Sequence, residues 1–386
     1  MTFLLIYLSI AVAYILFFAT FSILNTKKRD VSHLNNAASF TYLIPAYKED
    51  FVIIETAQNV LSQSDFGIND EVVVIADQLK TNTIENLQAI GATVIEVAFE
   101  KSTKAKAINV AMQILEKRTK KAAAIVLLDA DNHLVEGFIS KTKSAFAAGN
   151  KIIQTHRIAK NLDTPMAKLD AISEEINNSV FRLGHARIGL SAALIGSGLV
   201  MDFELFGNYL KKIDVVSGFD KQLELDILAD GLKIEYLPEA YILDEKVQNA
   251  QVFETQRTRW IAAQFNFAKQ NFVKAWSQLL FNQNIDFFNK VVQFFLPPRL
   301  LLLGFLFILL IINDLLPQSS TWILLLNVAL WASFVLATPR YLLKTINFNI
   351  LRELPLAFLS MAKAAFKIGK AQQTFLHTPH GATQNR

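Results

Sequence analysis

The sequence contains no cysteine among its 386 residues. Disulfide bonds, thiolate metal sites and cysteine nucleophiles are therefore excluded. It also lacks a GxGxxG motif and a Walker-type glycine loop, which bind phosphates through backbone amides. Its six histidines show no HxH or HxxxH spacing, which argues against a histidine metal site. A phosphate-bearing ligand would have to be neutralised differently, and a divalent cation held by carboxylates is the obvious route.

Charged residues are sparse, at 19% of the chain, whereas 52% of the residues are hydrophobic. The apolar excess lies in the first 25 residues and in residues 290–340, which indicates membrane-embedded ends around a soluble middle. The net charge is +4, but the cations are scattered and several lie beside apolar runs. This distribution favours a lipid bilayer with anionic lipids, or a phosphate-bearing substrate, over nucleic acid as a partner.

Residues 2–25 carry no charged side chain and are long enough to cross about 30 Å of hydrocarbon. Cations follow this stretch, at Lys27, Lys28 and Arg29, rather than preceding it. A cleaved signal peptide carries its positive charge first and ends at a small-residue cleavage site. We therefore expect an uncleaved anchor in a bacterial inner membrane, with the N-terminus outside and the following chain in the cytoplasm.

Two further apolar stretches, residues 296–316 and 321–338, predict a pair of membrane spans. Arg299 at the start of the first can reach the cytoplasmic interface, and Arg340 follows the second. The alternative is a buried hairpin of a soluble protein. Residues 351–373 mix lysines with apolar residues at helical spacing, which predicts an amphipathic helix on the inner membrane surface, or else a helix packed on the soluble domain.

Residues 39–160 alternate short apolar strands with amphipathic helices. This spacing predicts an α/β domain whose mostly parallel sheet is covered on both faces. The expected strands span residues 40–45, 71–76, 93–98, 123–128 and 151–155. Sheets of this kind bind ligands at the carboxyl ends of their strands. Polar residues follow the first, second and fourth of these strands, so we expect a ligand site where those strand ends meet.

Asp129 and Asp131 follow the fourth expected strand. In an extended segment residues i and i+2 face the same side, so both carboxylates could bind one hard cation, Mg2+ or Mn2+. Diphosphate oxygens would complete its shell, and the cation would support a leaving diphosphate. A solvated acidic turn is the alternative. His133 comes soon afterwards and is expected in a solvated loop, with a place in the metal shell as its alternative.

These residues resemble glycosyltransferase family 2, inverting enzymes with a GT-A fold, over roughly residues 38–265. The matching segments are IPAYKED (44–50), VVVIADQ (72–78), KSTKAKAINVAM (101–112), LLDADN (127–132), IGSGLVM (195–201) and QRTRW (256–260). The resemblance implies that the residues binding the nucleotide sugar are Pro45, Ala46, Tyr47, Glu49, Asp77, Lys104, Asp129 and Arg259. It implies a metal at Asp129 and Asp131, and an acceptor site formed by Gly196, Ser197, Gly198 and Trp260.

The last segment matches the QxxRW motif of membrane-bound synthases and lipid glycosyltransferases, with Gln256, Arg259 and Trp260 in place as catalytic residues. Arg259 can pair with phosphate oxygens, and Trp260 can form a flat wall for a sugar or, alternatively, anchor the chain at the membrane interface. We expect the motif in an amphipathic helix. The sequence then divides into an anchor (1–25), the GT-A domain (38–265), interfacial helices (266–295), two spans (296–338), an amphipathic interfacial segment (339–374) and a tail (375–386).

An inverting displacement needs a carboxylate to take the proton of the acceptor hydroxyl. Many family members carry this base in a Glu-Asp pair about eleven residues before a glycine, and counting back from Gly231 gives Phe219 and Asp220. The aspartate is kept, whereas phenylalanine replaces the glutamate. We predict Asp220 as the base. Glu224 and Asp226 are its rivals, and Glu224 would share a helix face with Asp220.

The leading prediction is a membrane-anchored transferase that moves a hexose or N-acetylhexosamine from a nucleoside diphosphate sugar, with a UDP-sugar first among donors. The acceptor would be a growing polysaccharide or a lipid-linked sugar. QxxRW favours processive synthesis, and three spans favour single additions unless the chain forms a homo-oligomer or works with an export partner. One alternative is a non-catalytic scaffold or sensor that binds nucleotide sugars. A nucleotidyltransferase is another, disfavoured because residues 47–50 replace the glycine-rich loop of such enzymes.

Overall fold

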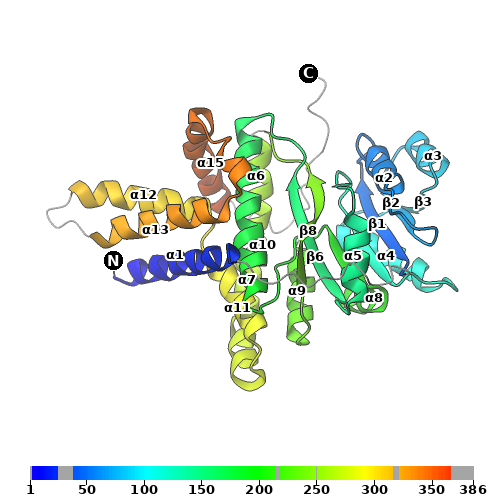
Figure 1. Cartoon of the computed structure of the whole chain (residues 1–386), viewed down its shortest axis with the longest axis horizontal. Helices are drawn as coiled ribbons and strands as arrows, with labels where there is room; N and C mark the ends of the chain where they lie inside the picture. Colours follow the sequence, from blue (N-terminus) through cyan, green and yellow to red (C-terminus); the bar gives the residue numbers. More distant parts are fainter. Residues whose placement is uncertain are drawn as a thin grey trace. The chain divides into compact units, whose positions relative to one another are not determined.

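The computed structural model describes residues 2–24, 38–213, 215, 218–248, 250–315 and 321–366. The cations at 27–29 and the tail at 375–386 fall outside these residues. The chain folds into two compact units (Figure 1). Unit 1 comprises Met1–Lys27, Asn161–Ser191 and Lys246–Gln373. Unit 2 comprises Lys28–Lys160, Ala192–Glu245 and Thr374–Arg386.

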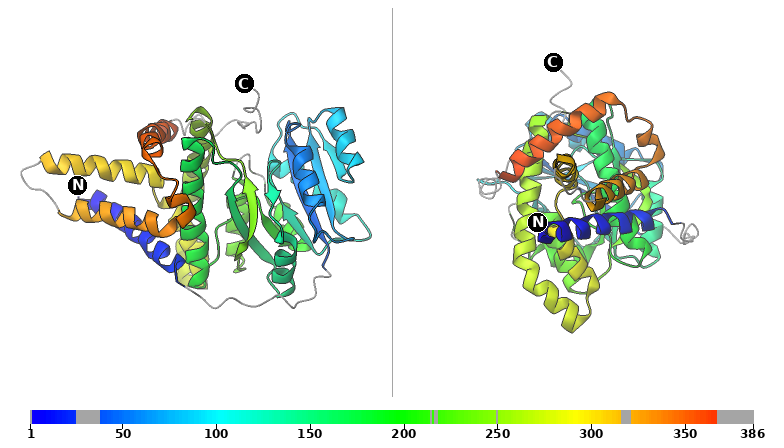
Figure 2. Two further views of the ribbon diagram at one scale, coloured as in Figure 1. Left: turned by 45° about the horizontal axis from the view of Figure 1, so that its top comes forward. Right: turned by 90° about the vertical axis from the view of Figure 1, so that its left-hand side faces the viewer.

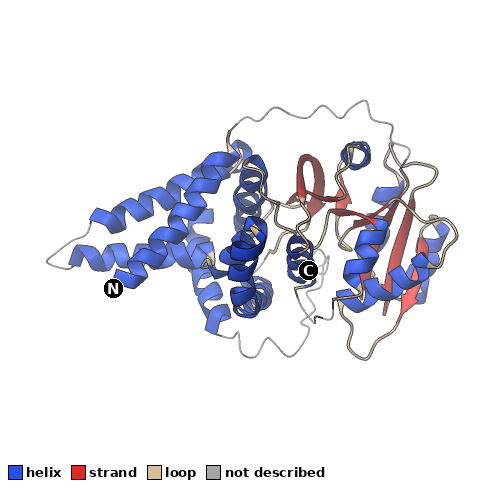
Figure 3. Cartoon of the chain, turned by 90° about the horizontal axis from the view of Figure 1, so that it is seen from below, coloured by secondary structure: helices blue, strands red, loops and turns tan. Residues whose placement is uncertain are grey.

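Unit 2 is built on one eight-stranded sheet in the order β3-β2-β1-β4-β7-β6-β8-β5, drawn red in Figure 3. Its strands are β1 (Phe40–Tyr47), β2 (Glu71–Asp77), β3 (Thr93–Val97), β4 (Ala124–Leu127), β5 (His133–Leu134), β6 (Ile152–Ala159), β7 (Leu199–Asp202) and β8 (Glu235–Asp244). β1 to β4 pair in parallel. β7 runs antiparallel to β4 and β6, and β5 runs antiparallel to β8. The expected parallel sheet is therefore one half of a mixed sheet.

The parallel half is covered on both faces, as the strand–helix alternation predicts. Phe40, Tyr42 and Ile44 on β1 face a core shared with α2 (Ile53–Leu61), α3 (Thr81–Ala89) and α5 (Phe138–Ala147). The alternate residues of the strands face the other side, where α4 (Lys104–Glu116) and α8 (Phe203–Leu210) contact the sheet. Each fully buried side chain of this kind stabilises the fold by about 1.5–3 kcal/mol.

The strand order creates a switch point between β1 and β4. β2 and β3 lie on one side of β1, and β4 lies on the other. The crossover through α2 therefore leaves β1 in one direction, and the crossover through α4 returns to its other side. Open α/β sheets bind ligands outside the carboxyl ends of the strands at such a point. The polar residues that follow β1, β2 and β4 consequently lie at the edge that topology marks for a ligand.

All described elements of unit 1 are helical. They are α1 (Thr2–Ser22), α6 (Pro165–Asn177), the π-helix η1 (Asn178–Leu183), α7 (Gly184–Arg187), α10 (Ala250–Asn282), α11 (Ile285–Phe295), α12 (Arg299–Leu315), α13 (Thr321–Ala337), α14 (Arg340–Leu343) and α15 (Phe348–Phe366). Figure 2 shows α10 and α11 side by side. α10 contains QxxRW and continues to Asn282, so the first interfacial helix expected after residue 265 is the same helix.

The three expected membrane spans are not confirmed. Within the described residues α1 is long and apolar enough over Phe3–Ser22. The helices Ile285–Phe295 and Arg299–Ile312 pass the same test only together, with a bend of 53° between them. Prolines 297 and 298 interrupt the helix there, because proline removes a backbone donor. α13 has 17 residues and reaches about 25 Å, short of the roughly 30 Å of a hydrocarbon core.

Helix α1 is packed into unit 1 rather than standing apart from it. His185 of α7 stacks on Phe18 with 3.6 Å between ring centroids. Gly184 lies against the α1 backbone so closely that a Cβ there would come 2.3 Å from the Phe18 carbonyl oxygen. Glycine is therefore required at position 184 for α1 to approach, and α1 contributes buried side chains to the same core as α12 and α13.

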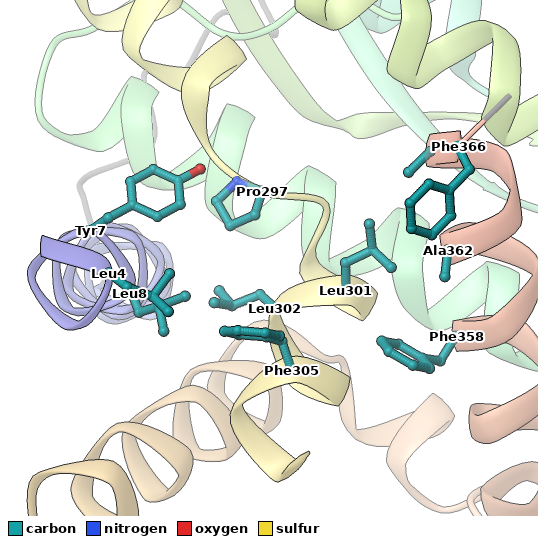
Figure 4. A pocket seen from close by; sticks show the side chains of 11 residues that line it. Leu4, Tyr7, Leu8, Pro297, Leu301, Leu302, Phe305, Phe358, Ala362 and Phe366 are labelled. Carbon is teal, nitrogen blue, oxygen red and sulfur yellow. The ribbon is translucent and has the colours of Figure 1, made fainter. Parts of the chain in front are cut away.

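Apolar surface remains open on these helices. A pocket of about 320 Å³ lies between α1, α12 and α15 and is lined by apolar and aromatic side chains such as Leu4, Leu302 and Phe358 (Figure 4). Large apolar side chains are also exposed on α1, α12, α13 and α15. The predicted helix at 351–373 corresponds to α15, whose buried Ala357 and Met361 pack in a cluster with residues of α10. Exposed apolar area of this kind marks an interaction surface.

Candidate active site

The carboxyl ends of β1 and β2 bring the first predicted site residues together. The strand register pairs Tyr47 with Asp77, and the Lys48 backbone N–H donates to the Asp77 carbonyl oxygen over 3.0 Å. Pro45 and Ala46 precede Tyr47 on the same strand. Glu49 follows it and is buried.

The Asp77 carboxyl is buried at the end of β2. Burial raises its pKa, while a hydrogen bond from Ser102 and the charge of Lys48 act in the opposite direction. Burying an ionisable carboxyl is unfavourable, so buried acids are rarely kept for stability. A buried carboxyl at the end of a strand is therefore a functional candidate. Its position suits hydrogen bonding to a ligand that reaches the edge of the sheet.

Asp129 and Asp131 lie in a turn. Strand β4 ends at Leu127, and the Asn132 N–H donates to the Asp129 carbonyl oxygen over 3.1 Å. The Asn132 side-chain oxygen in return accepts from the Asp129 N–H over 3.0 Å. The expectation that the two aspartates share a side because the segment is extended was therefore wrong in its geometry. The Asp129 side chain is 34% exposed, whereas Asp131 is 2% exposed.

Asp131 is held from inside the unit. Its Oδ2 accepts from the Glu245 backbone N–H over 3.0 Å, and its Oδ1 accepts from the Asn132 amide over 3.4 Å. Asn132 also donates to Asp244 over 3.1 Å. Sequence reasoning missed Asn132, although it directly follows the second aspartate. Its amide contacts the Asp129 backbone and the Asp131 side chain, so it holds the backbone of the turn.

Lys104 connects this turn to another part of the site. It is the first residue of α4, whose N-cap is Thr103. Its ammonium donates to Asp129 Oδ1 over 2.5 Å and to the Gly196 carbonyl oxygen over 2.7 Å. The Lys104 side chain is partly exposed. The structure thus brings Lys104, Asp129 and Gly196 into one contact group, although they come from three separate segments of the sequence.

The donor set around Asp129 suits a hard divalent cation that is shared with a ligand. No group of three or more His, Asp or Glu side chains that could hold a metal occurs among the described residues. Mg2+ is commonly held by one or two carboxylates together with substrate phosphates rather than by an all-protein cage. Asp129 supplies an accessible carboxylate, and Asp131 lies two residues further on in the same turn. These residues therefore fit a cation that a diphosphate completes.

His133 is not in a solvated loop. It lies in β5, is buried, and its Nε2 is 2.9 Å from the Lys160 ammonium and 3.5 Å from a Glu55 carboxylate oxygen. Burial and the Lys160 charge lower its pKa. The expectation of a solvated residue was wrong because the strand pairing of β5 with β8 draws His133 inside.

The glycine segment expected beneath the acceptor is a loop that leads into β7. The Gln154 amide donates to the Ser197 carbonyl oxygen over 3.0 Å. A Cβ on Gly198 would lie 2.4 Å from Thr155 Oγ1, and its φ is +60°. Only glycine fits there. The loop backbone therefore passes so close to β6 that position 198 has no room for a side chain.

Asp220 is in the first turn of α9 (Phe219–Ala229). A Cβ on Gly196 would lie 3.3 Å from Asp220 Cβ, so this residue borders the Lys104 contact group. Its side chain is 23% exposed, with the Lys221 ammonium 3.7 Å away. Glu224 is 2% exposed. Among the three rival carboxylates, Asp220 combines access to solvent with this proximity.

Two further residues of α9 bear on the choice of base. Asp226 accepts from the Gln222 amide through both oxygens at 3.0 Å. Phe219, which stands where many family members have glutamate, is buried. The substituted side chain therefore packs inside the unit, and the substitution leaves the half-buried carboxyl of Asp220 in place.

Gln256, Arg259 and Trp260 lie in α10 and belong to unit 1, so their approach to Asp220 stays a prediction. The side-chain oxygen of Gln256, Oε1, is buried without a hydrogen-bond partner in the described part of the chain. Burial lowers the pKa of Arg259. Trp260 is 36% exposed, with the Arg257 guanidinium 4.3 Å from its ring centroid.

Sequence reasoning did not identify a role for Arg257. Its guanidinium donates to the Asp170 carboxylate of α6 and also faces the ring of Phe253. Both members of this ion pair are buried. Because Asp170 is 87 residues away in the chain, no local motif could have revealed this pair. It ties the helix of the QxxRW motif to α6 and holds the neighbouring Trp260 ring.

Comparison with known proteins adds three findings. The sequence model described as "Glycosyltransferase like family 2" matches residues 37–263. A mannosyltransferase from Pyrobaculum calidifontis, solved in complex with GDP-Man and Mn2+, is 16% identical, with 94% of this chain and 97% of that chain covered and a TM-score of 0.56. Glucosyl-3-phosphoglycerate synthase from Mycobacterium tuberculosis, solved with Mn2+, UDP and glucosyl-3-phosphoglycerate, is 15% identical, with coverages of 59% and 80% and a TM-score of 0.39. No curated protein matches the sequence.

Proposed function

The chain belongs to glycosyltransferase family 2, and we propose that it transfers a sugar with inversion from a nucleoside diphosphate sugar to a membrane-associated acceptor. A UDP-sugar is the first donor to test, and the transferred group would be a hexose or an N-acetylhexosamine. The acceptor would be a growing polysaccharide or a lipid-linked sugar. The proposal takes the GT-A domain as residues 38–265, with QxxRW as a part of it.

One observation carries the proposal. Asp129, Lys104, Gly196 and Asp220 come from four separate segments and meet beside the switch point of the sheet. A carboxylate that can share a cation with phosphates thus lies within one contact group of a carboxylate that can take a proton. An inverting displacement needs both functions on opposite sides of the reacting carbon.

Asp220 would act on the acceptor. Its carboxylate accepts the proton of the acceptor hydroxyl, while the oxygen forms a bond to the anomeric carbon of the donor. The bond from that carbon to the diphosphate oxygen breaks, and its electron pair leaves with the diphosphate. Because attack and departure occur on opposite faces, the anomeric configuration inverts. The Lys221 ammonium lies 3.7 Å from the Asp220 carboxylate.

The remaining site residues would bind and orient the donor. Asp77 and Tyr47, side by side at two strand ends, would hold the base and ribose, with Pro45, Ala46 and Glu49 forming the wall around them. Asp129, with Asp131 beside it, would hold Mg2+ or Mn2+, which would supply positive charge to the leaving diphosphate. Arg259 would pair with phosphate oxygens. Gly196, Ser197, Gly198 and Trp260 would border the acceptor.

The membrane part of the proposal rests on unit 1. Apolar side chains exposed on α1 include Phe3, Ile6 and Ile10, and those on α12 include Phe307 and Ile311. Contiguous exposed apolar surface is unfavourable in water and favourable in hydrocarbon. We propose that α1 anchors the chain, with the catalytic domain on the cytoplasmic side of a bacterial inner membrane, and that α12, α13 and α15 enter or lie on the same bilayer.

The rival proposal is a scaffold that binds nucleotide sugars without turnover, motivated by Phe219. The burial of Phe219 weakens it, because this side chain packs in the unit interior while the Asp220 side chain stays partly accessible to solvent. A scaffold needs no base beside its ligand site. The presence of Asp220 next to Gly196 therefore favours the enzyme.

The test uses purified membranes that contain the full chain. A panel of labelled nucleotide sugars is supplied with Mg2+ or Mn2+, and both donor consumption and product size are measured. Long products would identify a processive synthase, and a single sugar added to lipid would identify a lipid glycosyltransferase. Nucleotide-sugar binding without consumption of any donor would contradict the proposal and support the scaffold.

A further inference from the structure

The Lys104 ammonium lies beside the Asp129 carboxylate, where a divalent cation would bind. The ammonium lies 2.5 Å from Asp129 Oδ1, the accessible carboxylate of the turn. A hard cation binds carboxylate oxygens at 2.0–2.6 Å. A cation at Asp129 would consequently lie within a few ångströms of the ammonium, and like charges at that separation repel.

The position of Lys104 in its helix indicates that its contact with Asp129, and not the helix, stabilises its charge. It is the first residue of α4, and no acidic residue occurs in the first turn. A cation at a helix N-terminus is unfavourable, because the partial charge there is positive. Thr103 already caps the helix by accepting from the Lys106 N–H. The stabilisation of Lys104 therefore comes from Asp129 and Gly196 rather than from the helix.

The same ammonium reaches the loop that borders the proposed base. It donates to the Gly196 carbonyl oxygen over 2.7 Å, and a Cβ on Gly196 would lie 3.3 Å from Asp220 Cβ. One side chain thus joins the cation site to the loop against which Asp220 packs. Any movement of the Lys104 ammonium away from Asp129 must also change its hydrogen bond to Gly196.

We propose that Lys104 is a tethered counter-ion that holds the place of the divalent cation at Asp129 until the nucleotide diphosphate arrives. This inference rests on the proposed function. A cation alone must displace or approach the ammonium and is disfavoured. A diphosphate brings negative charge that the ammonium can follow, which frees Asp129 for the cation and releases the Gly196 carbonyl. Cation and nucleotide then bind cooperatively, and the loop beside Asp220 changes only when both are present.

The test measures Mn2+ affinity by calorimetry on the full-length protein in detergent, with and without UDP or GDP. The variant is Lys104→Met, which keeps an unbranched side chain one atom shorter than that of lysine and removes its charge. The control is Lys106→Met, in the same helix turn and exposed. We expect wild type to bind Mn2+ more tightly with nucleotide than without, within the roughly 5- to 150-fold range of coupled sites. The control should behave like wild type.

In Lys104→Met we expect Mn2+ alone to bind more tightly than in wild type, by about tenfold, and the gain from nucleotide to shrink. A merely structural lysine would give the opposite result, because damage to the site lowers metal affinity. Unchanged or weaker binding of Mn2+ alone in Lys104→Met, with nucleotide-dependent binding intact in wild type, would overturn this inference and leave the proposed function standing. Absence of Mn2+ binding to wild type with either nucleotide would overturn both.

Discussion

His185 makes the stability of unit 1 depend on pH. Its Nδ1 donates to the Val180 carbonyl oxygen over 2.7 Å, its Nε2 accepts from the Gln293 amide over 3.2 Å, and its ring stacks on Phe18 of α1. Burial lowers its pKa from 6.5 to about 3. The Tyr14 hydroxyl also lies 2.9 Å from Nε2. Protonation would place a charge in this interior. The neutral ring is therefore the form that fastens α1.

The sign and size of the effect follow from linkage. Between pH 6.5 and 3 the unfolded chain binds a proton at His185 that the folded chain does not, so stability is full above pH 6.5 and falls as the pH is lowered. At pH 5 the loss is about 2 kcal/mol relative to pH 7.5, from 1.5 pH units at about 1.36 kcal/mol each. All four tryptophans lie in unit 1, so their fluorescence reports its unfolding.

The assay compares denaturant unfolding of the detergent-solubilised protein at pH 7.5 and pH 5.0. In His185→Gln, which keeps a neutral donor and acceptor, the pH-dependent loss should shrink by about 2 kcal/mol relative to wild type. His156→Gln in unit 2 should keep the wild-type dependence of the tryptophan signal. An equal loss of unfolding free energy in wild type and His185→Gln would refute the reasoning. It would mean that His185 has the same pKa in the folded and the unfolded chain.

Three other substitutions test separate parts of the account. Asp77→Asn removes a carboxyl whose pKa is raised by burial. The variant should have a higher melting temperature than wild type at pH 7. This gain should fade as the pH is lowered towards 3.8, the ordinary pKa of an aspartate. Calorimetry should show that the same variant binds UDP about tenfold or more weakly. Gly198→Ala should destabilise unit 2 by about 1–3 kcal/mol in circular dichroism unfolding, because its Cβ meets Thr155. Arg257→Met should cost about 3–5 kcal/mol in tryptophan-detected unfolding by stranding Asp170, and adding Asp170→Asn should recover most of it.

The parallel half of the sheet could be predicted from the sequence because its information is local. The apolar runs at 40–45, 71–76 and 93–98 correspond to β1, β2 and β3, each extended or shortened by one or two residues at its carboxyl end. In the mixed half the strand expected at 151–155 corresponds to β6, but the antiparallel pairing of β7 with β4 and β6, and of β5 with β8, was not predicted. β5 has two residues and β7 has four, and such short strands exist only because partners far away in the chain pair with them.

The site was predictable in its residue types and less so in its geometry. Motif spacing and the family resemblance made Asp129 and Asp220 candidates, and their roles stay predictions. The turn at Asp129 depends on the side chain of Asn132, which a strand-based argument could not foresee. The contact of Lys104 with Gly196 joins residues 92 positions apart. The three expected membrane spans are not confirmed, because hydropathy counts apolar residues and does not show that prolines 297 and 298 divide one apolar stretch into two helices.

The most direct test of the central claim compares Asp220→Asn with Glu224→Gln. Both variants remove one carboxylate charge from α9, and only Asp220 is proposed to take the acceptor proton. Turnover of the preferred donor is measured in membranes, with nucleotide binding measured on the same preparations. We predict that Asp220→Asn loses about 10²- to 10⁴-fold in kcat with donor binding retained, the usual contribution of a general base, and that Glu224→Gln keeps the larger share of activity. Full activity in Asp220→Asn would contradict the account.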